Sequence, residues 1–336
     1  MNPVRVAVIG AGAWGTNHVR VVGSEPRCEL AAIVDVSPLA CERASSLVAA
    51  PTFTSADAVL GDASIDAVVI ATPAPTHVPL ALAALRAGKH VLVEKPLALS
   101  ERDALALREA VDTTTRTLMV GHLMVFHPAV VRLRELLHSG SLGTLHYIHS
   151  IRANLGRIRQ DENALWSFGP HELSMLDFLL EKSPVNISAR GQRVLQDGIE
   201  DVVFLTLRYP GGEMAHLHLS WLHPRKERRL TLVCSQKMVE FDDVAPEKLR
   251  IHDKGYDRPP EFKDFAEYLT IRDGDVHIPR LPPGEPLRLQ LGHFLDCIEH
   301  AAPPRTDFAS ALRIVRVLEA AQRSLDLDGT PVNCPS

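Results

Sequence analysis

Three glycines near the start of the chain have the spacing of a phosphate-binding turn. Gly10, Gly12 and Gly15 follow an apolar run at residues 4–9 and precede a helix-compatible segment at 16–23. The first allows a sharp turn, the second removes a Cβ that would hold a pyrophosphate away, and the third lets the helix pack closely on the strand. A helix start also presents N–H groups and a positive dipole end to phosphates. The expected dinucleotide-binding residues are Gly10, Ala11, Gly12, Ala13, Trp14 and Gly15.

An acidic residue stands at the matching position after the next strand. The apolar run 30–34 ends at Asp35, about twenty residues beyond Gly15, which is the usual separation in this motif. A carboxylate there accepts hydrogen bonds from ribose hydroxyls and repels a 2′-phosphate. The pattern therefore predicts NAD as the cofactor, in preference to NADP. The alternative is a tight strand-to-helix turn that binds no ligand.

The elements that must position these residues alternate along the first third of the chain. Short apolar runs alternate with helix-compatible segments, which predicts a Rossmann-type, doubly wound parallel sheet. Ligands bind at the carboxyl ends of the strands in such a sheet. Besides the glycine turn, the predicted strand ends carry Asp35, Thr72, Pro73, His77, Glu94, Lys95, Pro96 and His122.

Beyond residue 127 the strand candidates lose their helical crossovers. Pro210-Gly211-Gly212 indicates a hairpin, and a large open, mostly antiparallel sheet in an α+β domain is the predicted arrangement. A helix is expected to begin at Pro170 and to end at residue 180, and residues 250–286 are expected to be irregular. We predict two domains: 1–123 for NAD binding, and 124–336 for substrate binding and oligomerisation, with C-terminal helices able to pack back on the first domain.

Composition argues against several classes of partner. The formal net charge is −5 over 336 residues and no basic block stands out, so nucleic acid and anionic membranes have no support. Five scattered cysteines without CxxC spacing are typical of reduced thiols in a cytoplasmic protein, and they indicate no metal site. No apolar run reaches membrane-spanning length, and the first strand begins too early for a signal peptide.

One lysine narrows the range of functions that the sequence allows. A lysine after an inner strand, facing a nicotinamide, is unfavourable unless it has a partner or a task, although a surface lysine in a turn is the ordinary alternative. The segments GAGAWG, ATPAPTH, VLVEKPLALS and HFLDCI together resemble the glucose-fructose oxidoreductase / inositol dehydrogenase / MocA family over essentially the whole chain. The resemblance implies a Rossmann domain, an open-sheet domain and redox chemistry on a sugar hydroxyl. It also implies that Lys95 touches that hydroxyl, that Pro96 helps shape the turn, and that the cofactor is lined by Thr72, Pro73, His77 and Glu94.

A second family position lies in the segment LWSFGPHELSMLDFLL. Members of the family commonly carry an aspartate there and, four residues later, a histidine at the start of a helix; here these positions are Ser167 and His171. The role of base or proton relay therefore shifts toward His171, because imidazole with its ordinary pKa of about 6.5 can take a hydroxyl proton. Lys95 as a cation would stabilise the alkoxide, and which of the two carries the proton stays open. An ordinary helix-capping or core histidine is the alternative.

The polar segment 150–167 bears on the substrate. It holds guanidinium groups suited to a diphosphate and amides suited to sugar hydroxyls or an N-acetyl group, namely Asn154, Arg157, Arg159 and Asn163. A solvated loop is the alternative. NLGRIRQDENALWSFGPH resembles a subgroup that acts on nucleotide-linked amino sugars, which implies NAD-dependent oxidation of the 3-hydroxyl of UDP-N-acetylglucosamine, ahead of an aminotransferase in lipopolysaccharide (lipid A) biosynthesis.

Several alternatives to this reading stay open. They are oxidation of UDP-N-acetylglucosaminuronate, oxidation of another sugar or a polyol such as inositol, and a sensor that binds NAD(H) without turnover. An open sheet leaves one broad face in need of cover, so we also expect a homo-oligomer, a dimer or a tetramer, formed through that sheet.

Overall fold

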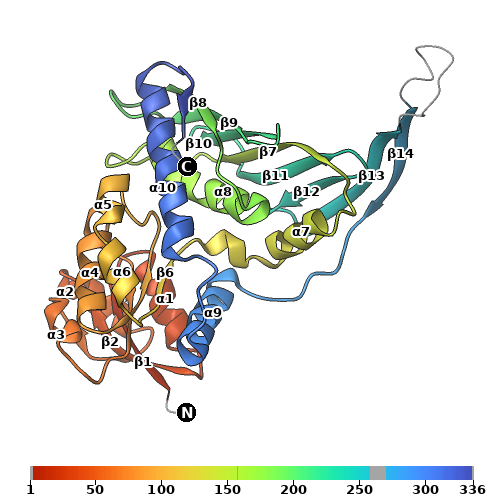
Figure 1. Cartoon of the computed structure of the whole chain (residues 1–336). Coiled ribbons are helices and arrows are strands. Elements are labelled where there is room, and N and C mark those ends of the chain that lie inside the picture. The colour runs from red at the N-terminus through yellow and green to blue at the C-terminus, as the bar shows by residue number, and fades with distance from the viewer. Residues whose placement is uncertain (1–2, 157, 258–269, 335–336) are drawn as a thin grey trace. The chain divides into compact units, whose positions relative to one another are not determined.

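The computed structural model of the chain describes residues 3–156, 158–257 and 270–334. The chain divides into two compact units, which we describe separately (Figure 1). The first consists of Met1–Phe126 and Gly284–Arg316, and the second of His127–Pro283 and Val317–Ser336. A segment near the C-terminus therefore returns to the first unit.

The first unit is built on a parallel sheet, which confirms the predicted doubly wound arrangement. The described residues form six strands in the order β3-β2-β1-β4-β5-β6. The order reverses between β1 and β4, and such a switch point is where ligands bind in this fold. The strands are β1 (Val4–Ile9), β2 (Cys28–Val34), β3 (Thr52–Phe53), β4 (Ala67–Ile70), β5 (His90–Val93) and β6 (Leu118–Val120).

Helices follow most of these strands. They are α1 (Gly15–Val22), α2 (Pro38–Ser45), α3 (Asp57–Leu60), α4 (His77–Arg86), α5 (Glu101–Leu105) and α6 (Arg108–Thr113), with short 3₁₀ turns at Ala74–Thr76 and Leu123–Phe126. The later helix α9 (Pro286–His300) also belongs to this unit. The sequence predicts one helix over 100–111, and this is wrong. Ser100 caps α5, but the backbone then turns so that Leu107 N–H bonds to the carbonyl of Ala104, and the Leu107 side chain is fully buried in the core.

The edge of this sheet is completed from the far end of the chain. Thr306 lies beside β6, and its carbonyl accepts a hydrogen bond of 2.9 Å from the backbone N–H of Val120. The Thr306 hydroxyl donates in turn to the carbonyl of Val120 at 2.7 Å. The backbone of the last strand is therefore partly satisfied by a segment that follows it by more than 180 residues.

The second unit contains a mixed, mostly antiparallel sheet, as predicted. Within the described residues its order is β14-β13-β12-β11-β7-β10-β9-β8-β15, and the β7–β10 pair is parallel. Antiparallel pairing of β9 with β10 confirms the hairpin, with Gly212 at a φ of +90°. The strands are β7 (Leu145–Ala153), β8 (Asn186–Gln192), β9 (Val202–Arg208), β10 (Met214–Ser220), β11 (Glu227–Cys234), β12 (Met238–Asp242), β13 (Leu249–Asp257), β14 (Thr270–His277) and β15 (Val332–Asn333).

Two predictions for this unit are wrong. Residues 250–286 are not irregular throughout, because they contain most of β13 and all of β14. Nearly all of β14 is exposed, so its sequence lacks the apolar alternation of a half-buried strand. The helix expected from Pro170 begins at Ala164 instead, since Asn163 Oδ1 accepts a hydrogen bond of 3.1 Å from Trp166 N and caps it.

Helices cover one face of the second sheet. Figure 1 shows α7 (Pro128–His138) and α8 (Ala164–Leu180) on that face, where α8 packs against β7, β9 and β10 and α7 packs against β12. A further helix, α10 (Phe308–Asp326), runs from the first unit into the second. Among the residues that the structure describes, no helix is long and apolar enough to span a membrane.

Candidate active site

The glycine turn has the geometry that nucleotide binding needs. Gly10 has a φ of +97°, and a Cβ on it would lie 2.6 Å from the carbonyl oxygen of Ala71. A Cβ on Gly15 would lie 1.8 Å from the carbonyl oxygen of Gly10. A Cβ on Gly12 would have no atom within 4 Å, so this position faces open space. Glycine is therefore required at positions 10 and 15, because any side chain there would clash with the backbone. Gly12 instead leaves room for a close approach of a pyrophosphate.

Asp35 lies directly against this turn. Its Oδ2 accepts a hydrogen bond of 2.7 Å from Ala11 N–H, and its Oδ1 accepts one of 2.8 Å from Ser37 N–H. Each carboxylate oxygen keeps a further lone pair, so the group can still accept from a ribose hydroxyl. The open space at Gly12 and the carboxylate at the end of β2 together fit NAD.

The loops after β4 and β5 are joined by one histidine. His77 is buried at the start of α4, and its Nδ1 lies 2.7 Å from the carbonyl oxygen of Pro96. Its Nε2 lies 2.8 Å from the carbonyl oxygen of Thr72. Both ring nitrogens therefore face backbone oxygens, and the side chain fixes the spacing of the two loops. Pro73 is exposed beside them.

Glu94 is the centre of a buried polar cluster. Its Oε1 accepts hydrogen bonds from Trp14 Nε1 at 2.6 Å and His18 Nε2 at 2.8 Å, and its Oε2 accepts one from Lys95 N–H at 3.2 Å. Burial alone would raise the pKa of Glu94, but the hydrogen bonds from His18 and Trp14 and the charge of Lys95 hold the pKa below its usual value. The group is therefore an anion at neutral pH. The sequence analysis does not name His18; its position three residues beyond Gly15 is the only local feature that could have drawn attention to it.

His122 lies at the end of β6, next to this cluster. It is only 2% exposed, and neither ring nitrogen has a hydrogen-bond partner among the described residues. Burial lowers the pKa of His122 to about 4, helped by the charge of Lys95 and opposed by that of Glu94. The neutral ring keeps one donor and one acceptor uncommitted. Lys95 itself is half-buried and precedes a cis peptide bond to Pro96.

In the second unit, α8 carries the other predicted catalytic residue. His171 is half-buried, and its carbonyl oxygen accepts a hydrogen bond of 2.8 Å from the Ser174 hydroxyl. Ser167 lies one turn earlier, so its side chain shares a helix face with His171. The next residue, Glu172, is fully buried and accepts hydrogen bonds from the Ser150 hydroxyl and Arg152 Nε, which anchor α8 to β7.

The predicted substrate residues before α8 have varied surroundings. Arg159 pairs with Asp161 at 2.9 Å and with Glu162 at 3.2 Å, both close in sequence. Asn163 caps α8 with its side-chain oxygen and donates with its amide to Glu200 at 2.7 Å and Gln322 at 3.0 Å. Asn154 is partly exposed at the end of β7. Arg157 lies outside the described residues.

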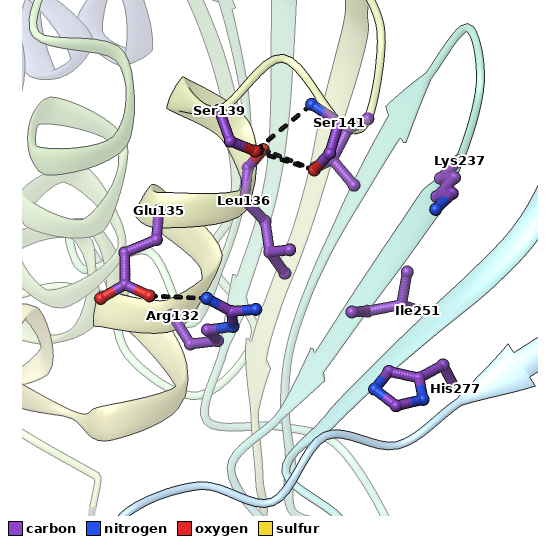
Figure 2. Close-up of a pocket in the computed structure, with 9 residues that line it drawn as sticks. Arg132, Glu135, Leu136, Ser139, Ser141, Lys237, Ile251 and His277 are labelled. Atoms are coloured by element: carbon purple, nitrogen blue, oxygen red, sulfur yellow. Dashed lines mark hydrogen bonds and ion pairs between the residues drawn. The ribbon is translucent and has the colours of Figure 1, made fainter.

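A cavity of about 550 Å³ lies elsewhere in the second unit. Figure 2 shows it between α7 and the strands β13 and β14, which contribute Ile251 and His277, and Arg132 and Glu135 pair at 2.8 Å on the helix side. None of the predicted site residues lines it. The described residues also contain no group of three histidine, cysteine or acidic side chains arranged to hold a metal ion.

The first unit is a dinucleotide-binding Rossmann domain, as shown by the order of its strands, its glycine turn and the position of Asp35. Residues 4–122 match the family model for oxidoreductases with an NAD-binding Rossmann fold, and residues 130–240 match the GFO/IDH/MocA C-terminal domain. Together the two models match more than half of the chain. The chain therefore belongs to the Gfo/Idh/MocA family of oxidoreductases, and its first unit is an NAD-binding Rossmann domain.

Known relatives align over nearly the whole chain. The chain is 28% identical to the inositol 2-dehydrogenase of Rhizobium meliloti (strain 1021), over 96% of this chain and 97% of that protein. It is also 28% identical to the UDP-N-acetylglucosamine 3-dehydrogenase of Acidithiobacillus ferrooxidans, over 95% of each. Among solved structures, GenD2 from gentamicin A biosynthesis in complex with NAD has a TM-score of 0.84 and 25% identity, over 100% of this chain and 97% of that one.

Proposed function

We propose that this protein oxidises a secondary hydroxyl of a sugar or polyol with NAD. The observation that supports this proposal most directly is the position of Lys95, whose backbone N–H donates to the Glu94 carboxylate beside the glycine turn. NAD would be held by the glycine turn and Asp35, and by the loops that contain Thr72, Pro73, Glu94 and Pro96. When bound, the nicotinamide supplies the hydride acceptor. The uncommitted donor and acceptor of His122 suit a polar group such as its carboxamide.

The chain's own residues would carry the proton chemistry. Lys95, as a cation, would stabilise the developing alkoxide and lower the pKa of the hydroxyl. His171 would take the hydroxyl proton, because Ser167 replaces the family's carboxylate and leaves the imidazole as the base at that position. This role requires Lys95 and His171, which belong to different units, to meet at the same substrate.

For the substrate we propose a UDP-linked N-acetylated amino sugar, oxidised at its 3-hydroxyl before transamination. The resemblance of residues 154–171 to enzymes of that kind supports this choice, as does the alignment with a UDP-N-acetylglucosamine 3-dehydrogenase. The equally similar inositol dehydrogenase supports a free polyol as the second candidate. The two substrates make different demands on Arg159. To bind a diphosphate, Arg159 would have to leave its ion pairs with Asp161 and Glu162, whereas a free polyol would leave these pairs intact.

A substrate panel tests the proposal. The protein is mixed with NAD and, separately, UDP-N-acetylglucosamine, UDP-N-acetylglucosaminuronate and myo-inositol, with a ketone trap to draw unfavourable oxidations forward. Reduced nicotinamide is followed by absorbance. We expect turnover with UDP-N-acetylglucosamine, abolished in Lys95→Met. Turnover of inositol alone would replace the substrate, and tight NAD binding without turnover of any compound would favour a sensor.

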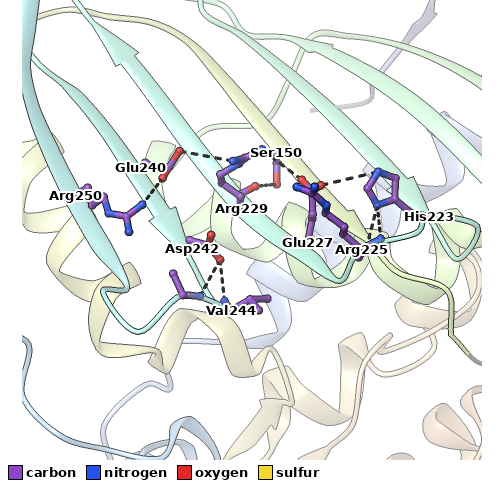
Figure 3. Close-up of polar contacts among 10 residues, drawn as sticks. Ser150, His223, Arg225, Glu227, Arg229, Glu240, Asp242, Val244 and Arg250 are labelled. Carbon is purple, nitrogen blue, oxygen red and sulfur yellow. Dashed lines mark hydrogen bonds and ion pairs between the residues drawn. The ribbon is translucent and has the colours of Figure 1, made fainter.

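We also propose a cytoplasmic homo-oligomer, a dimer or a tetramer, that covers the open face of the second sheet with another copy. This face carries exposed aromatic groups: Tyr147 is 42% exposed, and Phe204, stacked on His218, is 46% exposed. Figure 3 shows that charges of both signs alternate across β11, β12 and β13, where Glu240 lies between Arg229 and Arg250. A patch with both signs can complement a copy of itself. Light scattering on Phe204→Glu tests this, and an unchanged mass would contradict it.

A further inference from the structure

One carboxylate connects the beginning of the first unit with the loop after β5, about eighty residues later in the sequence. Glu94 bonds to Trp14 in the glycine turn, to His18 in α1 and to the backbone of Lys95 after β5. The two side-chain donors meet on the same oxygen, Oε1, and the other oxygen faces Lys95 N–H. The position of this carboxylate therefore sets both the orientation of the indole and the start of the loop that presents Lys95.

The surroundings leave this carboxylate little freedom. Glu94 is 8% exposed and His18 is 2% exposed, so neither group exchanges its partner freely for water. On the side of β6, a Cβ built on Gly121 would lie 3.0 Å from Glu94 Cδ, which shows how closely the backbone approaches. An ionised carboxylate only accepts hydrogen bonds, so His18 must present Nε2–H to it.

We infer that His18 is a positioning residue, which holds the Glu94 carboxylate in place and thereby fixes Trp14 and the backbone of Lys95 for catalysis. The inference goes beyond NAD binding itself, and its catalytic part rests on the role proposed for Lys95. The charged and titratable groups that act on Glu94 are His18 from α1, Lys95 from its own loop and His122 from the end of β6. Loss of His18 removes a donor to a buried anion while burial remains, so protonation of Glu94 becomes easier.

Indole N–H signals can test this without any substrate. The chain has three tryptophans, at positions 14, 166 and 221, so a ¹⁵N–¹H spectrum of the full protein shows few indole signals, and Trp14→Phe identifies one of them. The chemical shift of this signal is expected to change with pH as Glu94, which accepts the hydrogen bond of the Trp14 indole, becomes protonated. In His18→Leu we expect the midpoint to rise by about one pH unit or more, and NAD to bind about tenfold more weakly at pH 7 by calorimetry.

Two further variants separate positioning from a merely structural role. His18→Gln keeps a side-chain donor, so we expect the wild-type midpoint and NAD affinity to be restored within about threefold. Ser24→Ala, two residues beyond the C-terminal end of the same helix, is the control and should change neither quantity. An unchanged midpoint in His18→Leu, or equal losses in His18→Leu and His18→Gln, would overturn the inference.

The test stays decisive in two other situations. If His18→Leu does not fold, Glu94→Gln must abolish the titration of the Trp14 signal, and a signal that still titrates would overturn the inference. If no sugar or polyol is turned over, the proposed function fails while the titration and the NAD affinities still decide the coupling of His18 to the glycine turn.

Discussion

The imidazole Nδ1 of His77 lies 2.7 Å from the carbonyl oxygen of Pro96, nineteen residues further along the chain. The opposite nitrogen faces the carbonyl oxygen of Thr72, so one ring spans the loops after β4 and β5. In His77→Phe we expect a similar ring without donors, a loss of about 1–3 kcal/mol in the free energy of unfolding and about tenfold weaker NAD binding. Urea unfolding and calorimetry measure both. The exposed His300→Phe is the control, and equal effects in the two variants would contradict a bridging role.

The glycine turn predicts opposite effects at two positions. Gly10→Ala places a Cβ 2.6 Å from a backbone oxygen at a φ of +97°, so we expect a loss of stability of about 2 kcal/mol or more. Gly12→Val points into open space, so the fold should keep its stability while NAD binding weakens more than tenfold. Thermal unfolding with and without NAD separates the two. A Gly12→Val protein with normal NAD affinity would show that the pyrophosphate lies elsewhere.

Lys95→Met removes the proposed cation while keeping a flexible side chain of similar length. We expect turnover of the sugar to fall by about two orders of magnitude or more, because the alkoxide loses its stabilising charge. The NAD dissociation constant should stay within about threefold, as measured by calorimetry. Lys226→Met, at an exposed position in the second unit, controls for loss of one positive charge. Normal turnover in Lys95→Met would refute the assigned role.

His122 predicts a pH dependence of stability. Burial lowers the pKa of His122 to about 4 in the folded state, against about 6.5 in the unfolded chain, so the unfolded state binds more protons between these values. The resulting stabilisation is complete above pH 6.5 and is lost as the pH falls toward 4, by about 3 kcal/mol for this group. His122→Leu should therefore lose less stability than the wild type between pH 7 and pH 4 in urea unfolding. His90, whose pKa burial also lowers to about 4, keeps its own contribution in both proteins. Parallel stability curves would contradict the prediction.

Local patterns explain what could be predicted from the sequence. The glycine spacing and Asp35 indicate a nucleotide-binding turn, because the conformation of that turn depends on only a few residues. The hydrophobic runs of β1, β4 and β5 indicate strands that are buried on both faces. The bond between His18 and Glu94 joins residues 76 apart in sequence, and no local pattern indicates that pairing. The sequence does not predict the start of α8 correctly, because Pro170 resembles a first-turn proline whereas the cap is Asn163.

The pairing of Val120 with Thr306 has a consequence for biosynthesis. During translation, residues 1–126 are synthesised long before residues 284–316. The edge of β6 therefore lacks its hydrogen-bond partner Thr306 while most of the second sheet is being made. An uncovered strand border is a template for wrong pairing with other chains. Residues 284–316 thus complete the edge of the sheet only after most of the second unit has been made, and until then the exposed edge of β6 favours misassembly with other chains.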